Sequence, residues 1–491
     1  MSSSTRREFL SKGAVVGATA WAAASRARAA QALRGWSRRG KSKQPNVVVL
    51  MLDALRPDYT QAYGAARPTS PWMANFAKQA AVFDRCWSTS TWTAPACASL
   101  FSGLYPPEHG IVEGFMANVR RESRQKEKGV AELAPQGSLI NTFAPDMVLL
   151  PQYLREFGYR CFGLATNPNI GPEIGFDRGF EKFIAKPEGT ADQVGAWVED
   201  WREELTQGED PYFLYLHYMD VHKPYNQRAP WYQADDAAGG SRPDASGEPR
   251  SAAEEAAEAY RSELRFLDEQ LAALEKSWAW DDNTLVLVVS DHGEEFGEHG
   301  GIGHPFQMHA ELNRVVFMAR GPGVQAGRRA TPVGLHDVLP TLLDWLQLAP
   351  PVETSGQSLS SLFAGSGDAA LEDRMLFAHR RKNKFKPLDA WAVNQADWRM
   401  ILDQDGQLQL FNIATDPLEQ TPISAKQAKD VHARLRGALQ AWAAQGISKR
   451  AVMREVNQSE AEREVLERLG YTDKAPESEP EAPESGAGDD G

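Results

Sequence analysis

The stretch Asn46-Val47-Val48-Val49-Leu50-Met51-Leu52, followed directly by Asp53, decides the fold. It is apolar almost throughout and rich in β-branched side chains. Such runs form strands that are buried on both faces of a parallel sheet. An acidic residue directly behind the strand lies at the carboxyl edge of that sheet, where α/β proteins gather their functional groups.

Similar apolar runs recur along the chain, and helical patterns separate them. The other runs are 160–165, 212–218, 285–289 and 315–319. The expected helices are one that starts at Pro71 with Ser70 as N-cap, then 150–157, 252–274 and 338–346. This alternation predicts an α/β fold whose doubly wound, mostly parallel sheet is flanked by helices.

The sequence pattern changes after Arg374. Short alternating segments at 389–393, 398–402 and 408–412 predict a small antiparallel sheet, and 431–444 predicts an amphipathic helix that covers one face. We therefore expect a large α/β domain over 45–374, a C-terminal α+β subdomain over 375–450 and a largely disordered acidic tail over 451–491. Irregular composition predicts loops at 120–137 and 235–250.

The amino-terminal segment is typical of an export signal. Arg6 and Arg7 precede Phe9-Leu10, a weakly apolar run spans 13–24, and small residues follow. The paired arginines resemble a twin-arginine signal, and the run is shorter than the roughly 20 residues of a membrane span. We expect residues 1–32 to be a signal read by the twin-arginine export machinery and 33–44 to be a basic linker. The mature protein would then be periplasmic or secreted, without a stable membrane span; the alternative is a disordered basic arm.

The net charge of −13 conceals two unlike ends. Residues 1–43 carry ten Lys or Arg and one acid, whereas 473–491 carry seven acids and one Lys. The acidic balance argues against nucleic acid as a partner. Three cysteines, Cys86, Cys97 and Cys161, are too few for a disulfide framework.

Carboxylates and imidazoles follow three of the expected strands. They are Asp53 after the first strand, Asp291 and His292 after the strand at 285–289, and His217, Asp220 and His222 at or beyond the end of the strand at 212–218. Each alone is compatible with a turn cap, but their shared placement is what a divalent cation site requires. Carboxylate-rich sites suit Ca²⁺, Mg²⁺ or Mn²⁺, and more imidazole favours Zn²⁺.

A short expected helix contributes a hydroxyl. Pro95 and Gly103 frame the helix, so Thr93 lies at its N-terminus. Backbone N–H groups there favour an anion and reduce the energetic penalty of ionising a nearby hydroxyl. Taken alone, Thr93 is better explained as an ordinary N-cap.

Several ordered motifs resemble the sulfatases of the alkaline phosphatase superfamily. Thr93-x-Pro95-x-x-x-x-Leu100-x-x-Gly103 keeps the spacing of the sulfatase signature C/S-x-P-S-R-x-x-L-x-x-G. The other matching segments are 46–58, 104–111, 218–225, 290–294, 297–300, 340–344 and 398–402. The resemblance covers roughly residues 45–450.

The resemblance implies roles for these residues. Asp53, Asp291 and His292 would bind metal, with Thr93 completing the coordination and attacking sulfur or phosphorus. His222 and His304 would contact the substrate oxyanion or protonate the leaving group. Lys223, Arg56 and Asn167 are the predicted substrate contacts, the first two because they supply positive charge.

Departures from the family pattern bear on the mechanism. Sulfatases convert Cys or Ser at the nucleophile position to formylglycine; Thr93 occupies that position, so no formylglycine is expected. Cys97 replaces the signature Arg, and Asn167 lies where Gly-Lys-Trp-His is usual. Calcium or magnesium is the expected metal, with one or two zinc ions as the alternative; Asp220, His222 and His336 are candidates for a second site.

We therefore predict a metal-dependent hydrolase that cleaves sulfate or phosphate esters, mono- or diesters, of a small molecule or glycan through Thr93. One alternative is a transferase of a phosphoryl-type group. Another is a binding protein that keeps the fold without the chemistry. His109 and His299 are interpreted as loop-ordering residues, and Cys97 as a small buried residue.

Overall fold

The computed structural model describes residues 44–113, 138–232, 251–304, 307–348, 354–382, 388–448, 450–456, 464–466 and 468. The export signal, nearly all of the basic linker, the loops predicted at 120–137 and 235–250 and most of the acidic tail lie outside these residues. Within the described residues, no helix combines the length and apolar character needed to cross a membrane.

The centre of the molecule is an eight-stranded sheet. Its order is β13 (Gly327–Arg329), β2 (Ala81–Phe83), β12 (Phe317–Arg320), β8 (Thr284–Val289), β1 (Asn46–Leu52), β7 (Tyr212–Tyr218), β5 (Arg160–Ala165) and β6 (Lys182–Ala185). The neighbouring strands β8, β1, β7, β5 and β6 all run parallel, so their carboxyl ends lie at the same edge of the sheet. Met51 pairs with His217, which in turn pairs with Ala165, and this register brings the residues after the strands together.

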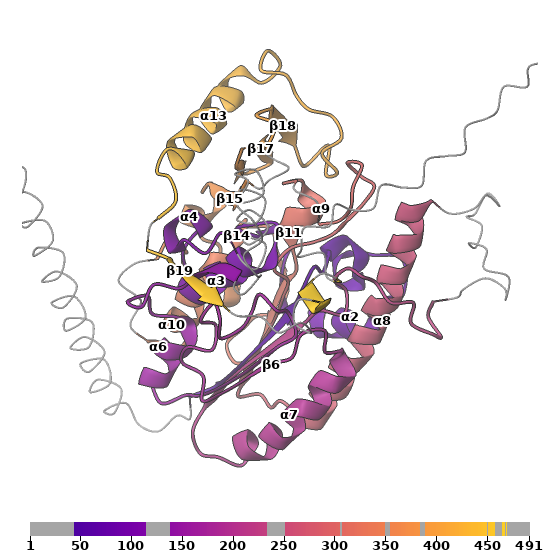
Figure 1. The fold of residues 1–491 in the computed structure, drawn as a ribbon, viewed down its shortest axis with the longest axis vertical. Coiled ribbons are helices and arrows are strands. Elements are labelled where there is room, and N and C mark those ends of the chain that lie inside the picture. Colours follow the sequence, from indigo (N-terminus) through magenta and orange to yellow (C-terminus); the bar gives the residue numbers. More distant parts are fainter. Residues whose placement is uncertain are drawn as a thin grey trace, which may run out of the picture.

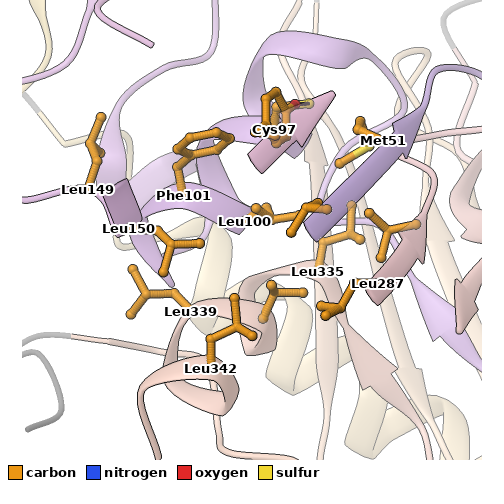
Figure 2. Close-up of a cluster of buried hydrophobic side chains, with 14 of the residues drawn as sticks. Met51, Cys97, Leu100, Phe101, Leu149, Leu150, Leu287, Leu335, Leu339 and Leu342 are labelled. Atoms are coloured by element: carbon orange, nitrogen blue, oxygen red, sulfur yellow. Dashed lines mark hydrogen bonds between the residues drawn. The ribbon is translucent and has the colours of Figure 1, made fainter. Parts of the chain in front are cut away.

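One face of the sheet is covered by α3 (Thr93–Ser102), α6 (Leu150–Glu156) and α10 (Val338–Trp345). Met51 and the other odd-numbered residues of β1 point to this face because side chains alternate along a strand. Figure 2 shows Leu100 and Phe101 of α3 among Met51, Leu287 and Leu150. Helix α3, which begins at Thr93, is therefore packed directly on the sheet.

The opposite face is covered by α2 (Pro71–Ala77), α7 (Ala191–Thr206) and α8 (Ala252–Trp278), with α7 and α8 lying along one side in Figure 1. A Ser251–Glu254 capping box starts α8: the Ser251 hydroxyl accepts from Glu254 N, and the Glu254 carboxylate accepts from Ser251 N. Helices on both faces make β1 inaccessible, which explains its continuous apolar sequence.

The C-terminal part forms its own layer. The antiparallel sheet runs β15 (Leu376–Arg380), β16 (Ala390–Gln395), β17 (Trp398–Leu402) and β18 (Leu408–Asn412), and α13 (Lys429–Ala443) packs on it. Figure 1 shows α13 and these strands beside α4 and α9 at one end of the molecule. Trp391, Tyr105 and Trp442 pack together, so the two layers share an aromatic contact.

Short elements complete the structure. They are η1 (Pro57–Tyr59), η2 (Gln61–Tyr63), β3 (Cys86–Trp87), α4 (Pro106–His109), β4 (Ser138–Thr142), β9 (Glu295–Phe296), β10 (Ile302–Gly303), α9 (Ala310–Asn313), β11 (Arg314–Val315), β14 (Val333–Gly334), η3 (Leu335–Asp337), α11 (Ser360–Phe363), α12 (Ala369–Glu372) and β19 (Val452–Val456).

The predicted fold class is confirmed, with local differences. The run at 315–319, expected as a strand of the parallel sheet, is divided between β11 and β12, and β12 is antiparallel to both neighbours. Helix α7 was not predicted. Residues 452–456, placed in the acidic tail, form β19, which pairs with β4.

Candidate active site

Thr93 opens α3 at the carboxyl edge of the sheet. Trp92 is the N-cap residue, and Gly103 ends the helix with φ 71°, a left-handed conformation that glycine adopts without strain. The Thr93 side chain is only 1% exposed and points toward the ends of β1 and β8. The hydroxyl is thus held in a buried polar site.

Asp53, Asp291 and His292 surround that hydroxyl. Thr93 Oγ1 lies 3.4 Å from Asp53 Oδ2 and 3.3 Å from His292 Nε2. His292 Nε2 in turn lies 3.2 Å from Asp53 Oδ1 and 3.6 Å from Asp291 Oδ2. The structure therefore brings together the four residues that the sequence predicted as metal ligands.

Backbone contacts orient these side chains. His292 Nδ1 donates to the carbonyl of Gly293 at 2.9 Å, which leaves Nε2 facing the carboxylates. Asp291 Oδ1 accepts from His292 N at 2.8 Å and from Ala54 N at 3.1 Å. Ala54 has φ 60°, an uncommon conformation for alanine, and this turn aims its N–H at Asp291. Such supporting contacts are typical of metal-binding groups.

Asn167 contacts the site from the end of β5. Its Nδ2 donates to Asp53 Oδ2 at 2.6 Å and to Thr93 Oγ1 at 3.2 Å. Its Oδ1 accepts from Asn169 N at 2.8 Å, which fixes the amide orientation. Asn167, predicted as a substrate contact, thus positions the nucleophile candidate and a metal-ligand candidate.

The donor set fits a divalent cation. Asp53 Oδ1 and Asp291 Oδ2 are buried and accept no hydrogen bond from any described residue. Burial and the neighbouring charge of Asp53 raise the pKa of Asp291 to about 7. Burial opposes protonation of His292, but Asp291 and Asp53 still raise its pKa to about 9. Two carboxylates this close need positive charge between them, and a cation supplies it.

His222 and His304 form the opposite wall. Their ring centroids are 4.6 Å apart, and His304 lies 5.1 Å from the ring of His292. His222 Nδ1 contacts the carbonyl of Lys223 at 2.5 Å, and His304 Nδ1 contacts Glu294 Oε1 at 3.2 Å. Burial lowers the pKa of His222 to about 4 and that of His304 well below its usual range. Both rings are therefore neutral at pH 7.

The two predicted cationic contacts differ in placement. Lys223 is exposed, and its side chain lies beside Gly303. Arg56 is 2% exposed and pairs with Asp58 at 2.7 Å and Glu298 at 2.6 Å. Its charge is therefore already compensated, and its side chain is buried beside the turn after β1.

Arg380 was missed by sequence reasoning. It lies at the end of β15 in the C-terminal sheet, with Nη1 2.8 Å from Thr91 Oγ1 and Nη2 3.5 Å from the carbonyl of His304. It links the loop before Thr93 to the loop that carries His304. No local pattern around 376–380 predicted this strand or this contact.

Further groups of metal-ligating atoms lie near the site. Four sets have ligand atoms within 4.8 Å of one another: Asp53, His222 and His292; Cys97, His217 and Asp291; His222, Glu294 and His304; and Glu295, His299 and Glu311. Among the described residues, Asp220 and His336 join none of these sets. Asp220 accepts from Ala191 N, and His336 packs on Tyr105, so the second site considered from sequence is not assembled.

The central sheet, with carboxylates, imidazoles and a helix-borne hydroxyl at its carboxyl edge, defines an alkaline phosphatase-like α/β protein. A solved protein in complex with its substrate D-glucosamine-2-N,6-O-disulfate matches with TM-score 0.65 and 16% identity, covering 82% of this chain and 98% of its own. The phosphonate monoester hydrolase of Agrobacterium radiobacter matches with TM-score 0.63 and 17% identity, covering 85% and 100%.

Sequence comparison identifies the family. The family model described as Sulfatase matches residues 45–348, so the chain belongs to the sulfatase family and is an ester hydrolase. Choline-sulfatase of Rhizobium meliloti (strain 1021) is 22% identical over 78% of this chain and 82% of its own length. The multifunctional alkaline phosphatase superfamily protein PehA of Trinickia caryophylli is 23% identical over 76% and 88%.

Proposed function

We propose that this chain is a metal-dependent hydrolase of sulfate or phosphate esters in which Thr93 is the nucleophile. What supports this role is the position of Thr93 Oγ1, within 3.4 Å of Asp53, His292 and Asn167 at the start of α3. A hydroxyl buried among carboxylates and imidazoles, with helix N–H groups beside it, is arranged for attack on an anionic centre.

Asp53, Asp291, His292 and Thr93 would hold the metal. When bound, a divalent ion there lowers the pKa of the hydroxyl and offsets charge on the transferred group. Two carboxylates favour Ca²⁺ or Mg²⁺, and the imidazole makes Zn²⁺ the alternative. No formylglycine is involved, because Thr93 occupies the nucleophile position.

The residues suggest a two-step displacement. Thr93 loses its proton to water and bonds to sulfur or phosphorus, while the bond from that atom to the leaving oxygen breaks. The leaving oxygen takes a proton from His222 or His304. Water then attacks the same atom, the bond to Thr93 breaks and Thr93 regains a proton, and the proton of the water returns to the imidazole.

An anionic substrate makes these imidazoles competent acids. His222 Nδ1 is engaged with the carbonyl of Lys223, so its proton for the leaving group must be carried on Nε2. Burial keeps His222 neutral in the free protein, and a sulfate or phosphate beside it raises its pKa. Substrate binding thus favours the protonated form of His222, which can then act as the general acid.

A glycan ester or a small-molecule ester is the proposed substrate class, in keeping with the sulfated sugar bound by one matching structure. Export through the twin-arginine machinery to the periplasm or outside is proposed from residues 1–32, which carry the paired arginines. Lys223, whose side chain is exposed to solvent, would contact the anionic substrate.

Turnover of an aryl sulfate, a phosphate monoester and a phosphodiester tests the nucleophile. We expect Thr93→Ala to lose at least about 10³-fold in kcat, because the covalent step is gone. Thr93→Ser is the matched control, since it keeps the hydroxyl and should retain part of the activity. Equal rates for Thr93→Ala and wild type would overturn the assignment.

A further inference from the structure

A thiol, an imidazole and a carboxylate meet directly behind the catalytic hydroxyl. Cys97 follows Thr93 by one turn of α3, His217 lies near the end of β7, and Asp291 follows β8. All three side chains are fully buried, and one ligand atom from each lies within 4.8 Å of the other two. Figure 2 shows Cys97 on the side of α3 that faces the strand of Met51.

His217 lacks the partners that buried imidazoles normally have. Neither ring nitrogen makes a hydrogen bond within the described residues, and Asp291 Oδ2 accepts none. The nearest charged atom to His217 Nε2 is Asp53 Oδ2, 3.7 Å away, beyond hydrogen-bond range. Buried polar groups in native proteins are nearly always hydrogen-bonded or bound to a metal. The ring nitrogens of His217 and Oδ2 of Asp291 are therefore available as ligand atoms.

We propose that Cys97, His217 and Asp291 bind a second divalent ion, Zn²⁺ by their chemistry, with Asp291 shared between the two metal sites. Thiolate and imidazole are the ligands that distinguish zinc sites from calcium or magnesium sites. The candidate first site contains no sulfur, so the two sites differ in the metal they prefer.

The geometry needs only a small adjustment. An ion at the centre of a triangle with sides of at most 4.8 Å is at most about 2.8 Å from each corner. If each ligand atom moves toward the ion by about 0.5–0.8 Å, the distances become the bond lengths of about 2.0–2.3 Å that Zn²⁺ makes with nitrogen, oxygen and sulfur. Tyr215 donates its hydroxyl to Cys97 Sγ at 3.8 Å.

Charge balance favours the second ion. Among the described residues, no Lys or Arg forms an ion pair with Asp53 or Asp291, and Cys97 stands where the family signature has Arg. Two divalent ions are balanced by the Asp53 and Asp291 carboxylates, the Cys97 thiolate and an ionised Thr93. The second ion thus replaces the missing cation and favours the charged nucleophile.

Cobalt titration of the full chain, stripped of metal with a chelator, tests the second site. We expect two equivalents of Co²⁺ per chain and a near-ultraviolet thiolate-to-cobalt charge-transfer band. Zinc added afterwards should displace the cobalt and remove the band. Absence of the thiolate band at every cobalt ratio would overturn the proposal. One equivalent with the band would instead contradict the first site, at Asp53, Asp291 and His292.

Variants separate this site from the chemistry at Thr93. Cys97→Ala should bind one equivalent and show no band, whereas Cys86→Ala and Cys161→Ala, also buried free cysteines, should keep it. Thr93→Ala should keep the band even if it is inactive, so failure of the nucleophile assignment is distinguishable from failure of this one. A band that survives in folded Cys97→Ala would contradict the assignment. The wild-type measurement decides even if a variant does not fold.

Discussion

Two buried clusters of carboxylates and histidines differ in the groups that balance their charges. The catalytic cluster, named for its proposed role, comprises Asp53, Thr93, Asp291 and His292. The closed cluster comprises Glu295, His299, His309, Glu311, Arg399 and Glu419. Each includes residues that follow β8, and both mix acids with imidazoles.

The closed cluster provides its own counter-charges. His299 Nδ1 lies 2.6 Å from Glu311, and its Nε2 lies 3.1 Å from the carbonyl of Glu419, so a protonated ring donates both ways. Arg399 Nε lies 2.9 Å from Glu419 Oε1. The rings of His299 and His309 stack at 3.6 Å. This cluster joins the α/β domain to the C-terminal sheet.

The catalytic cluster has only one internal cation. Although burial opposes protonation, its two carboxylates raise the pKa of His292 to about 9, and within the described residues no Lys or Arg pairs with them. One imidazolium does not balance two buried carboxylates and a substrate anion, and a divalent cation would supply the remaining charge. The comparison teaches that composition alone does not separate the two kinds of cluster; the closed cluster contains a buried guanidinium and the catalytic cluster does not.

Metal removal should cause the largest change in activity. A chelator, or Asp53→Asn, should lower kcat/KM by about 10³-fold or more, because charge on the reacting group is no longer offset. Metal should also stabilise the wild type, by about 2.7 kcal/mol at a hundred times its Kd, and Asp53→Asn should lose that increment. Thermal unfolding with and without metal measures it. Full activity after exhaustive chelation would contradict the account.

Breaking the closed cluster should instead affect stability. Glu419→Gln leaves the guanidinium of Arg399 buried without its counter-charge, and we expect a loss of about 3 kcal/mol in the free energy of unfolding. Activity per folded molecule should change little. The control is Glu258→Gln, which removes an ion pair to exposed Arg67 and should cost at most about 1 kcal/mol. Equal losses for the two variants would show that the closed cluster is not special.

The closed cluster should also make stability depend on pH. Burial opposes protonation of His299, but Glu311 raises its pKa to about 9. The resulting stabilisation, about 1–3 kcal/mol, should be fully present below about pH 6.5 and lost as pH rises through 9. Denaturant unfolding of wild type and His299→Gln at both ends of this range checks it. A difference between the two proteins that does not shrink at high pH would argue against the pairing, and Glu311→Gln should remove the same dependence.

The smallest effect is expected at the exposed edge of the catalytic cluster. Lys223→Ala should raise KM by about two- to tenfold with kcat and stability nearly unchanged, because an exposed cation steers and holds an anion only weakly. Added salt should shrink the difference between the two proteins. Lys223→Arg keeps the charge and serves as the control; a large fall in kcat would place Lys223 in the chemistry instead.

Much of the fold was predictable because local pattern and burial agree. Strands β1, β5, β7 and β8 are apolar throughout since helices cover both faces. The antiparallel direction of β12 depends on partners far away in the chain. Helix α7 did carry a signal, in the spacing of Val194, Val198 and Trp201, and it was overlooked.

The candidate site was predictable where a strand end fixes a residue. Asp53, Asp291 and His292 meet because their parallel strands end at one edge. The ion pair of Arg56 could not be predicted, because its partner Glu298 lies 242 residues away in the chain. Cys97 lies close to His217 because of how α3 packs on the sheet and how β7 is registered with its neighbours. Local sequence patterns predict neither of these features.

Rapid-quench peptide mass spectrometry of the metal-loaded protein during turnover tests the central claim most directly. The account predicts a sulfuryl or phosphoryl group on the peptide that contains Thr93, absent in Thr93→Ala. An adduct on another residue, or undiminished turnover by Thr93→Ala, would contradict it.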